Sequence, residues 1–337
     1  MKFPDTKYMG SKQNLLPFIT AHIKNLKFKT AFDAFSGSGC VAYALKSMGK
    51  RVFANDFLSF AYHTARALVE NSTVTLSSQD VSALLQENKR APAFVQKTFK
   101  NLYFNQDDCK FLDHLWANAL RYHGTLKHSI ILAAAARACM KKRPRGIFTF
   151  VGQKGWDGRR DLRLSMKEQF LEAIKLFNGT IFSNGQRNRA FCKDVFDLDP
   201  EGLDLVYIDT PYVSQYSDCD YTRRYHFVEG YMTYWQNVEI LQHTKTKKIK
   251  SYNTPFSTKQ KVEDAFRRLF HHFRKSALVV SYSSNNIPDK KEMIMLLKEF
   301  KSKVAFFETK HQYSHGNHNH KIGNNNNAVK EYLFVAQ

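Results

Sequence analysis

The chain of 337 residues is poor in cysteine, in acidic residues and in long apolar segments. Its few cysteines form no C-x-x-C pair, which argues against a disulfide scaffold and against a zinc site. No apolar run reaches transmembrane length and the first residues are polar, so we expect neither a membrane span nor a signal peptide. These absences favour a cytoplasmic protein with free thiols and no metal; the cysteines are Cys40, Cys109, Cys139, Cys192 and Cys219.

Acidic residues are outnumbered by basic ones. The chain has 51 Lys and Arg against 30 Asp and Glu, a formal net charge of +21. Such a surplus steers a protein toward a polyanion and makes binding depend on salt. An anionic membrane is the competing partner, but no basic amphipathic anchor or lipidation signal is present. The composition therefore favours nucleic acid.

One stretch combines a buried strand with polar chemistry at its end. Residues 203–208 form a short apolar run, followed at once by Asp209, Pro211 and Tyr212. In open α/β sheets, ligands bind at the carboxyl ends of parallel strands. Asp209 is therefore a candidate site residue, although a strand followed by a proline turn would look the same.

A second element lies far upstream. Residues 31–42 read as a strand, a turn containing Gly37 and Gly39, and a helix whose N-terminus offers backbone N–H groups. The next predicted strand, 51–55, ends at Asp56, where an acid commonly binds ribose hydroxyls. The third glycine of the dinucleotide pattern G-x-G-x-x-G is missing. A nucleoside ligand without a pyrophosphate is therefore favoured.

Four short motifs occur in a characteristic order: K-Y-M-G-S-K at 7–12, F-S-G-S-G at 35–39, N-D at 55–56 and D-T-P-Y at 209–212. In this order the chain resembles the D12 class of DNA adenine-N6 methyltransferases, the family of the Dam enzymes. The resemblance covers roughly residues 1–70 and 180–337. One departure is visible, because the family usually has proline where Thr210 stands.

The resemblance implies a fold, a cofactor and a set of site residues. The fold is α/β, a Rossmann-like seven-stranded class I methyltransferase sheet built from 1–70 and 180–337, with an inserted, mainly helical target-recognition region at 71–179. The cofactor is S-adenosyl-L-methionine and the main partner is double-stranded DNA. The enzyme would belong to a restriction-modification system, with a cognate endonuclease as a further partner, or to a phage. The implied catalytic residues are Asp209, Thr210, Pro211 and Tyr212. The implied cofactor-binding residues are Tyr8, Lys12, Asp33, Phe35, Gly37, Gly39, Asp56, Asp194 and Asp209.

Basic residues are concentrated between positions 137 and 163. This segment holds nine Lys and Arg and two acids, with aromatic residues and glycines between them. Such a mixture suits contacts to phosphates and some bases, although a solvated basic face is the alternative. With two arginines further on, the predicted DNA-binding residues are Lys141, Lys142, Arg143, Arg145, Lys154, Arg159, Arg160, Arg163, Arg223 and Arg224.

Several other segments carry structural expectations. The aromatic residues between 94 and 104 predict a small core, with DNA-facing rings as the alternative. Residues 105–108 predict a cap region before a long apolar helix that includes 130–140. The tyrosine-rich segment 213–227 predicts a functional loop. The final strands, 303–309 and 331–335, are expected to be antiparallel neighbours.

The predicted chemistry is methyl transfer to an exocyclic amine. The lone pair of such an amine is delocalised into the ring, so acceptors for its hydrogens favour the transition state. Asp209 supplies one such acceptor. Three alternatives stay open: cytosine-N4 methylation, which usually has serine in place of the motif's acid, RNA adenine methylation, and a non-catalytic DNA-binding subunit that retains the fold.

Overall fold

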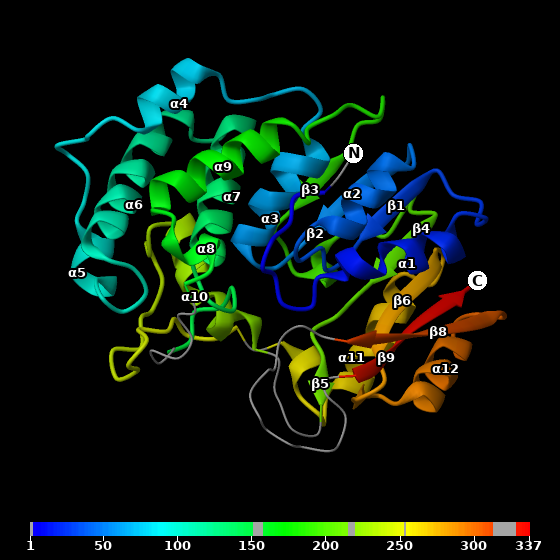
Figure 1. The fold of residues 1–337 in the computed structure, drawn as a ribbon. Helices are drawn as coiled ribbons and strands as arrows, with labels where there is room; N and C mark the ends of the chain where they lie inside the picture. Colours follow the sequence, from blue (N-terminus) through cyan, green and yellow to red (C-terminus); the bar gives the residue numbers. More distant parts are fainter. Residues whose placement is uncertain (1–2, 151–157, 215–219, 253, 313–327) are drawn as a thin grey trace. The chain divides into compact units, whose positions relative to one another are not determined.

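The computed structural model describes residues 3–150, 158–214, 220–252, 254–312 and 328–337 (Figure 1). The chain divides into two compact units. The sheet unit comprises Gly10–Phe57, Gln186–Asp220 and Tyr252–Gln337, and the helical unit comprises Met1–Met9, Leu58–Gly185 and Tyr221–Ser251.

A seven-stranded sheet organises the sheet unit. The order is β3 (Arg189–Phe191), β2 (Arg51–Asn55), β1 (Thr30–Asp33), β4 (Leu205–Ile208), β6 (Ala277–Ser283), β9 (Ala328–Ala336) and β8 (Val304–Gln312). The first five strands are parallel to one another. Strand β9 is antiparallel to both β6 and β8, as expected for the last two strands. The predicted α/β class and seven-stranded methyltransferase sheet are confirmed.

Helices cover both faces of this sheet. On one face, α11 (Val262–His272) and α12 (Lys290–Lys298) form a hydrophobic core with the strands, to which the fully buried Phe266 and Phe270 contribute. Burying a side chain of this size stabilises the fold by about 1.5–3 kcal/mol. The opposite face is covered by α1 (Leu16–Ile23) and α2 (Cys40–Ser47), which contact each other. The central strand β4 is apolar and buried throughout, as expected for a strand that is covered on both sides.

Short elements connect the strands of the sheet unit. The 3-10 helix η1 (Lys12–Leu15) leads into α1, and Pro17 lies in the first turn of α1, as its fixed φ allows. Two further 3-10 helices are present: η5 (Val195–Asp197) follows β3, and η6 (Pro255–Ser257) precedes α11. Strands β5 (Val213–Ser214) and β7 (Asn286–Ile287) form a separate antiparallel pair.

Helix α7 (Leu126–Lys141) is the centre of the helical unit, and nearly all of its side chains are buried. It contacts α9 (Met166–Asn178), whose N-terminus has a capping box formed by Ser165 and Glu168. The unit also contains the π-helix η2 (Arg66–Glu70), the 3-10 helix η3 (Leu120–Tyr122), α3 (Ser59–Ala65), α4 (Ser78–Leu84), α5 (Phe94–Phe99), α6 (Gln106–Ala119), α8 (Arg160–Arg163) and α10 (Tyr221–Met232).

The aromatic residues between 94 and 104 form a core, as predicted. Phe99, Tyr103 and Phe104 are buried, and their rings lie against Phe227 of α10. The Tyr103 hydroxyl donates a hydrogen bond to the Thr246 carbonyl at 3.0 Å. Because these rings contact one another, the alternative of a DNA-facing surface is not supported for them.

The prediction for residues 105–108 is wrong in one respect. Asn105 does cap a helix, because its side chain accepts a hydrogen bond from the Asp108 N–H at 2.8 Å. That helix is α6, however, and it ends before Gly124, which has a φ of +79°. Thr125 then provides a separate cap for α7, so two helices replace the single one expected.

The tyrosine-rich segment is not a loop throughout. Helix α10 begins at Tyr221, and its Tyr225 and Phe227 side chains are fully buried. Buried rings on a helix explain the aromatic content better than a functional loop does. Residues 215–219 lie outside the described part of the chain, as do Cys219 and Lys154.

Among the described residues, Cys40, Cys109, Cys139 and Cys192 are free thiols. Among the helices that the structure describes, none is long and apolar enough to span a membrane. Both observations concern the described ranges only.

Candidate functional site

The two predicted site segments lie at neighbouring strand ends. Strands β1 and β4 are parallel, with Asp33 paired to Tyr207. The Ala34 N–H donates a hydrogen bond to the Tyr207 carbonyl at 3.0 Å. Since the glycine turn follows β1 and Asp209 follows β4, both segments emerge at the same carboxyl edge. The glycine turn and the Asp209 segment therefore lie side by side.

Two carboxylates hold the glycine turn in shape. Gly37 and Gly39 have φ values of +49° and +79°, which L side chains rarely adopt. Asp56, at the end of β2, accepts the Gly37 N–H at 2.7 Å. Asp33, at the end of β1, accepts the Ala42 N–H of α2 at 3.0 Å. One of the helix N–H groups expected to face a ligand is therefore already bound by protein.

The second carboxylate oxygen of Asp33 is a buried acceptor. Within the described residues it has no hydrogen-bond partner, and the same holds for the buried hydroxyls of Ser36 and Thr210. Burial, with the nearby charges of Asp209 and Asp56, raises the pKa of Asp33 to about 8. Buried polar atoms are normally hydrogen-bonded, so this group suits a ligand that brings donors or a positive charge.

Asp209 belongs to a closed set of three side chains. The Lys12 ammonium lies 2.9 Å from Asp209 Oδ2 and donates to the Tyr212 hydroxyl at 2.6 Å. The Tyr212 hydroxyl donates to Asp209 Oδ1 at 2.7 Å. Burial disfavours the charge of Lys12, but Asp209 and Glu331 outweigh it, so the pKa of Lys12 is raised. Lys12 is 3% exposed and Asp209 16%, so the carboxylate is not sealed inside the protein.

Strand β3 brings Asp194 to the same edge of the sheet. The Asn55 side chain fastens the ends of β2 and β3 together by donating to the Lys193 carbonyl and accepting the Lys193 N–H. Asp194 itself is exposed, and its side chain accepts the Phe196 N–H at 3.0 Å as the cap of η5. The structure thus gives Asp194 a local structural role, and its predicted role at the cofactor stays a prediction.

Sequence reasoning missed an exposed aromatic pair beside Asp56. Phe57 and Tyr252 are 49% and 45% exposed, and their ring centroids are 4.7 Å apart in an edge arrangement. An exposed aromatic ring is a ready stacking surface for a base. The available signal was an aromatic residue directly after the acid that ends β2. The partner, Tyr252, carried no sequence signal.

Tyr8 belongs to the helical unit. Its ring stacks on Tyr225 with centroids 5.2 Å apart and planes 3° apart, and it also lies against Tyr221. The Met9 N–H donates to the Tyr225 hydroxyl at 2.6 Å. These contacts explain an aromatic residue at position 8, and its predicted place beside the cofactor stays a prediction.

Two of the predicted DNA-binding cations are buried. Lys142 forms an ion pair with Asp108 at 2.8 Å. Arg143 is 1% exposed and donates to the carbonyls of Tyr103 and Thr149. A buried cation with internal partners stabilises the fold, and we therefore propose no DNA contact for Lys142 and Arg143.

The other predicted cations differ in exposure. Lys141 pairs with Asp5 and Asp161, and Arg160 pairs with Glu172. Arg145 and Arg224 are half-buried. The exposed candidates among the described residues are Arg159, Arg160, Arg163 and Arg223.

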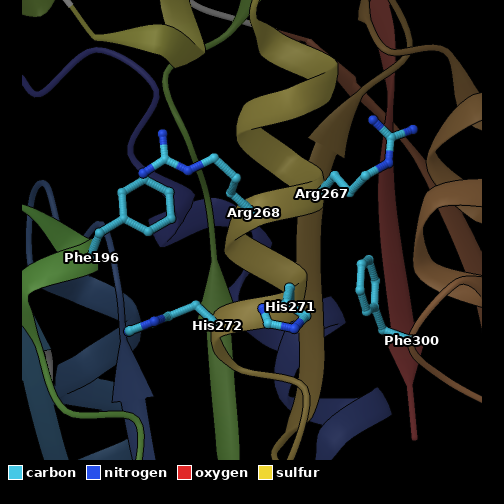
Figure 2. A pocket seen from close by; sticks show the side chains of 6 residues that line it. All are labelled: Phe196, Arg267, Arg268, His271, His272 and Phe300. Carbon is cyan, nitrogen blue, oxygen red and sulfur yellow. The ribbon is translucent and has the colours of Figure 1, made fainter.

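A surface pocket of the sheet unit is lined mainly by residues of α11 (Figure 2). Arg267 there is bound by Glu263, Asp264 and Glu299. His272 hydrogen-bonds to the Leu198 carbonyl at 2.9 Å. These groups already have protein partners, so the pocket does not carry the predicted chemistry. Its lining residues are Phe196, Arg267, Arg268, His271, His272 and Phe300.

Comparisons with known proteins agree with this geometry. The type II methyltransferase M2.HphI of Haemophilus parahaemolyticus is 27% identical over 331 residues, which cover 93% of each chain. The modification methylases StsI of Streptococcus sanguinis and LlaI of Lactococcus lactis are 27% and 25% identical, over 87% of this chain but only 46% and 49% of their own lengths. The family described as D12 class N6 adenine-specific DNA methyltransferase matches residues 8–296. Because that match covers most of the chain, the protein belongs to the D12 class of N6 adenine-specific DNA methyltransferases.

Proposed function

We propose that the protein transfers the methyl group of S-adenosyl-L-methionine to N6 of adenine in double-stranded DNA, with Asp209 as an acceptor for the hydrogens of the amine. One observation carries this proposal. The Asp209 strand end and the glycine turn lie on neighbouring parallel strands, so a methyl donor held by the turn would adjoin the acceptor.

The residues at the sheet edge fit the proposed cofactor. S-adenosyl-L-methionine carries an ammonium group, a sulfonium, two ribose hydroxyls and an adenine. The unpartnered oxygen of Asp33 suits a cationic group, Asp56 suits the ribose, and Phe57 suits the adenine ring. The Phe35–Gly39 turn allows close backbone approach. When bound, the cofactor supplies a methyl group that is already activated.

Lys12 is a less direct cofactor residue than the resemblance implies. Its ammonium is bound to Asp209 and Tyr212, both in the acceptor motif. A role at the cofactor's carboxylate would require Lys12 to exchange one partner for another. We therefore propose that Lys12 acts first on the acceptor motif.

The acceptor motif performs the chemistry through orientation and charge. The Asp209 carboxylate and the main-chain carbonyl of Thr210 accept the hydrogens of the amine, which frees its lone pair for attack. Pro211 stiffens this backbone, and the Tyr212 hydroxyl fixes Asp209 in one orientation. The Tyr212 ring offers a face for the base. The target base must be flipped out of the duplex, at a cost of a few kcal/mol.

Cofactor binding and target recognition are proposed for different segments of the sequence. We propose that the segments 1–70 and 180–337 bind the cofactor and carry catalysis, and that 71–179 recognises the target. The exposed Arg159, Arg163 and Arg223 are the proposed phosphate contacts. We propose that the enzyme belongs to a restriction-modification system with a cognate endonuclease, which the names of the relatives as type II methyltransferases and modification methylases support.

The test is a methyl-transfer assay. The purified protein is incubated with tritiated S-adenosyl-L-methionine and DNA of varied sequence at low salt, and the labelled nucleoside is identified. The proposal predicts label in N6-methyladenine. Label in N4-methylcytosine, preferential label in RNA, or no label with a folded protein would each contradict it.

A further inference from the structure

The sheet unit contains a second carboxylate whose burial is unusual. Glu331 lies within strand β9 and is only 1% exposed, although it is an acid. It pairs with Ser283 of β6 and Thr309 of β8. A glutamate is almost never fully buried unless a charged or hydrogen-bonding partner stabilises it. Glu331 therefore requires a functional or structural reason.

Glu331 lies on the same face of the sheet as Asp209. Side chains alternate along a strand, and the core beneath α11 and α12 takes Ile208 of β4 and Phe334 of β9. Asp209 is the next residue after Ile208, and Glu331 is three residues before Phe334. Both odd-numbered acids are thus directed to the opposite face. Helix α1 lies on this opposite face, where the ring centroids of His22 and Phe307 are 4.0 Å apart.

Lys12 is a buried cation on which both acids act. It starts η1, the 3-10 helix that leads into α1 on this same face of the sheet. Its ammonium contacts Asp209 directly, and Glu331 also raises the pKa of Lys12. Asp209 and Glu331 thus act on one buried ammonium from two different strands, β4 and β9.

We infer that Glu331 is a positioning residue, which holds the Lys12 ammonium when Asp209 turns its oxygens toward the target amine. This inference rests on the proposed role of Asp209. A buried ammonium that loses its counter-ion is strongly destabilised. With only Asp209 as a partner, Lys12 would compete with adenine for the carboxylate. With Glu331 present, the ammonium keeps a counter-ion and Asp209 is released for the substrate.

The test compares Glu331→Gln with Glu308→Gln. Glu308, on the neighbouring strand β8, is exposed and pairs with Lys330, so it is a matched control away from Lys12. Glu331→Gln is expected to lower kcat roughly 10-fold or more. The KM for S-adenosyl-L-methionine and the melting temperature are expected to stay near those of Glu308→Gln. Glu331→Asp, which keeps the charge, is expected to recover part of kcat.

Three results would overturn the inference. The first is a kcat of Glu331→Gln equal to that of the control. The second is a fall of kcat that is accompanied by a fall of the melting temperature and that Glu331→Asp does not relieve. A merely structural role of Glu331 predicts this result. If Glu331→Gln fails to fold, the double variant Lys12→Met/Glu331→Gln decides: recovery of folding supports the coupling to Lys12, and continued unfolding contradicts it. An active Asp209→Asn protein would instead overturn the proposed function itself.

Discussion

The ammonium of Lys12 lies 2.9 Å from a carboxylate oxygen of Asp209. The two residues come from the first and the last of the four sequence motifs, and the fold joins them into one ion pair. The Tyr212 hydroxyl bonds to both, so the acceptor of the proposed reaction is held by a lysine and a tyrosine. An adenine amine that binds to Asp209 must therefore replace the contacts of Asp209 with Lys12 or Tyr212, because the carboxylate already has both partners.

Replacing Gly39 by alanine is expected to weaken cofactor binding. The left-handed φ of +79° costs an L residue about 1–2 kcal/mol, and the change lies in the turn proposed to hold the cofactor. Gly49→Ala is the matched control, because its φ of +75° imposes the same strain and nothing lies within 4 Å of its added carbon. Both variants should lose similar unfolding free energy. Only Gly39→Ala should lose affinity for S-adenosyl-L-methionine in a calorimetric titration. Equal affinities of the two variants would contradict the proposal that this turn holds the cofactor.

The stability of the ligand-free protein should fall as pH rises toward 8. Burial, then Asp209 and Asp56, raises the pKa of Asp33 from 3.8 to about 8. Between these values the unfolded chain has lost a proton that the folded chain keeps, so the free energy of unfolding falls by up to about 1.4 kcal/mol per pH unit. Below the lower value and above the upper one, this contribution is constant.

Urea unfolding between pH 5 and pH 8 measures this dependence. In Asp33→Asn the amide oxygen can still accept the Ala42 N–H, but the titrating group is gone. The variant should therefore show a shallower decline than the unaltered protein. Identical slopes would show that Asp33 does not titrate in this range.

Arg163 and Arg143 should respond differently to substitution. Arg163 is exposed, so Arg163→Gln should leave the melting temperature unchanged and weaken DNA binding. Loss of one phosphate contact should reduce the slope of log affinity against log salt by about 1. Arg143→Gln should lower the melting temperature instead, because its buried guanidinium donates to two backbone carbonyls. If the slope of log affinity against log salt is unchanged in Arg163→Gln, Arg163 does not contact a DNA phosphate.

The strand ends that carry the site could be predicted because they follow from local patterns. An apolar run that ends in Asp209 and a turn that contains Gly37 and Gly39 each announce a strand end, and parallel strands bring their ends to one edge. Burial could not be read in the same way. Lys142 and Arg163 look alike in the sequence, and only tertiary contacts separate the buried cation from the exposed one.

Partners across the sheet were equally hidden. Glu331 stands in a strand pattern whose alternation does not reveal a buried acid, and its relation to Lys12 depends on the order of β4, β6 and β9. The helix α10 was mistaken for a loop because its buried rings are mixed with polar residues such as Arg223. In both cases the deciding contacts join segments that are distant in the sequence.

The central claim is tested most directly by Asp209→Asn in the tritium transfer assay, combined with calorimetric binding of S-adenosyl-L-methionine. The substitution keeps the size of the side chain but removes its charge and turns one acceptor into a donor. We expect methyl transfer to fall by roughly 100-fold or more, as for the loss of an electrostatic contact made in the transition state, while cofactor binding is largely retained. Transfer within a few-fold of the unaltered protein by a folded Asp209→Asn variant would contradict the account.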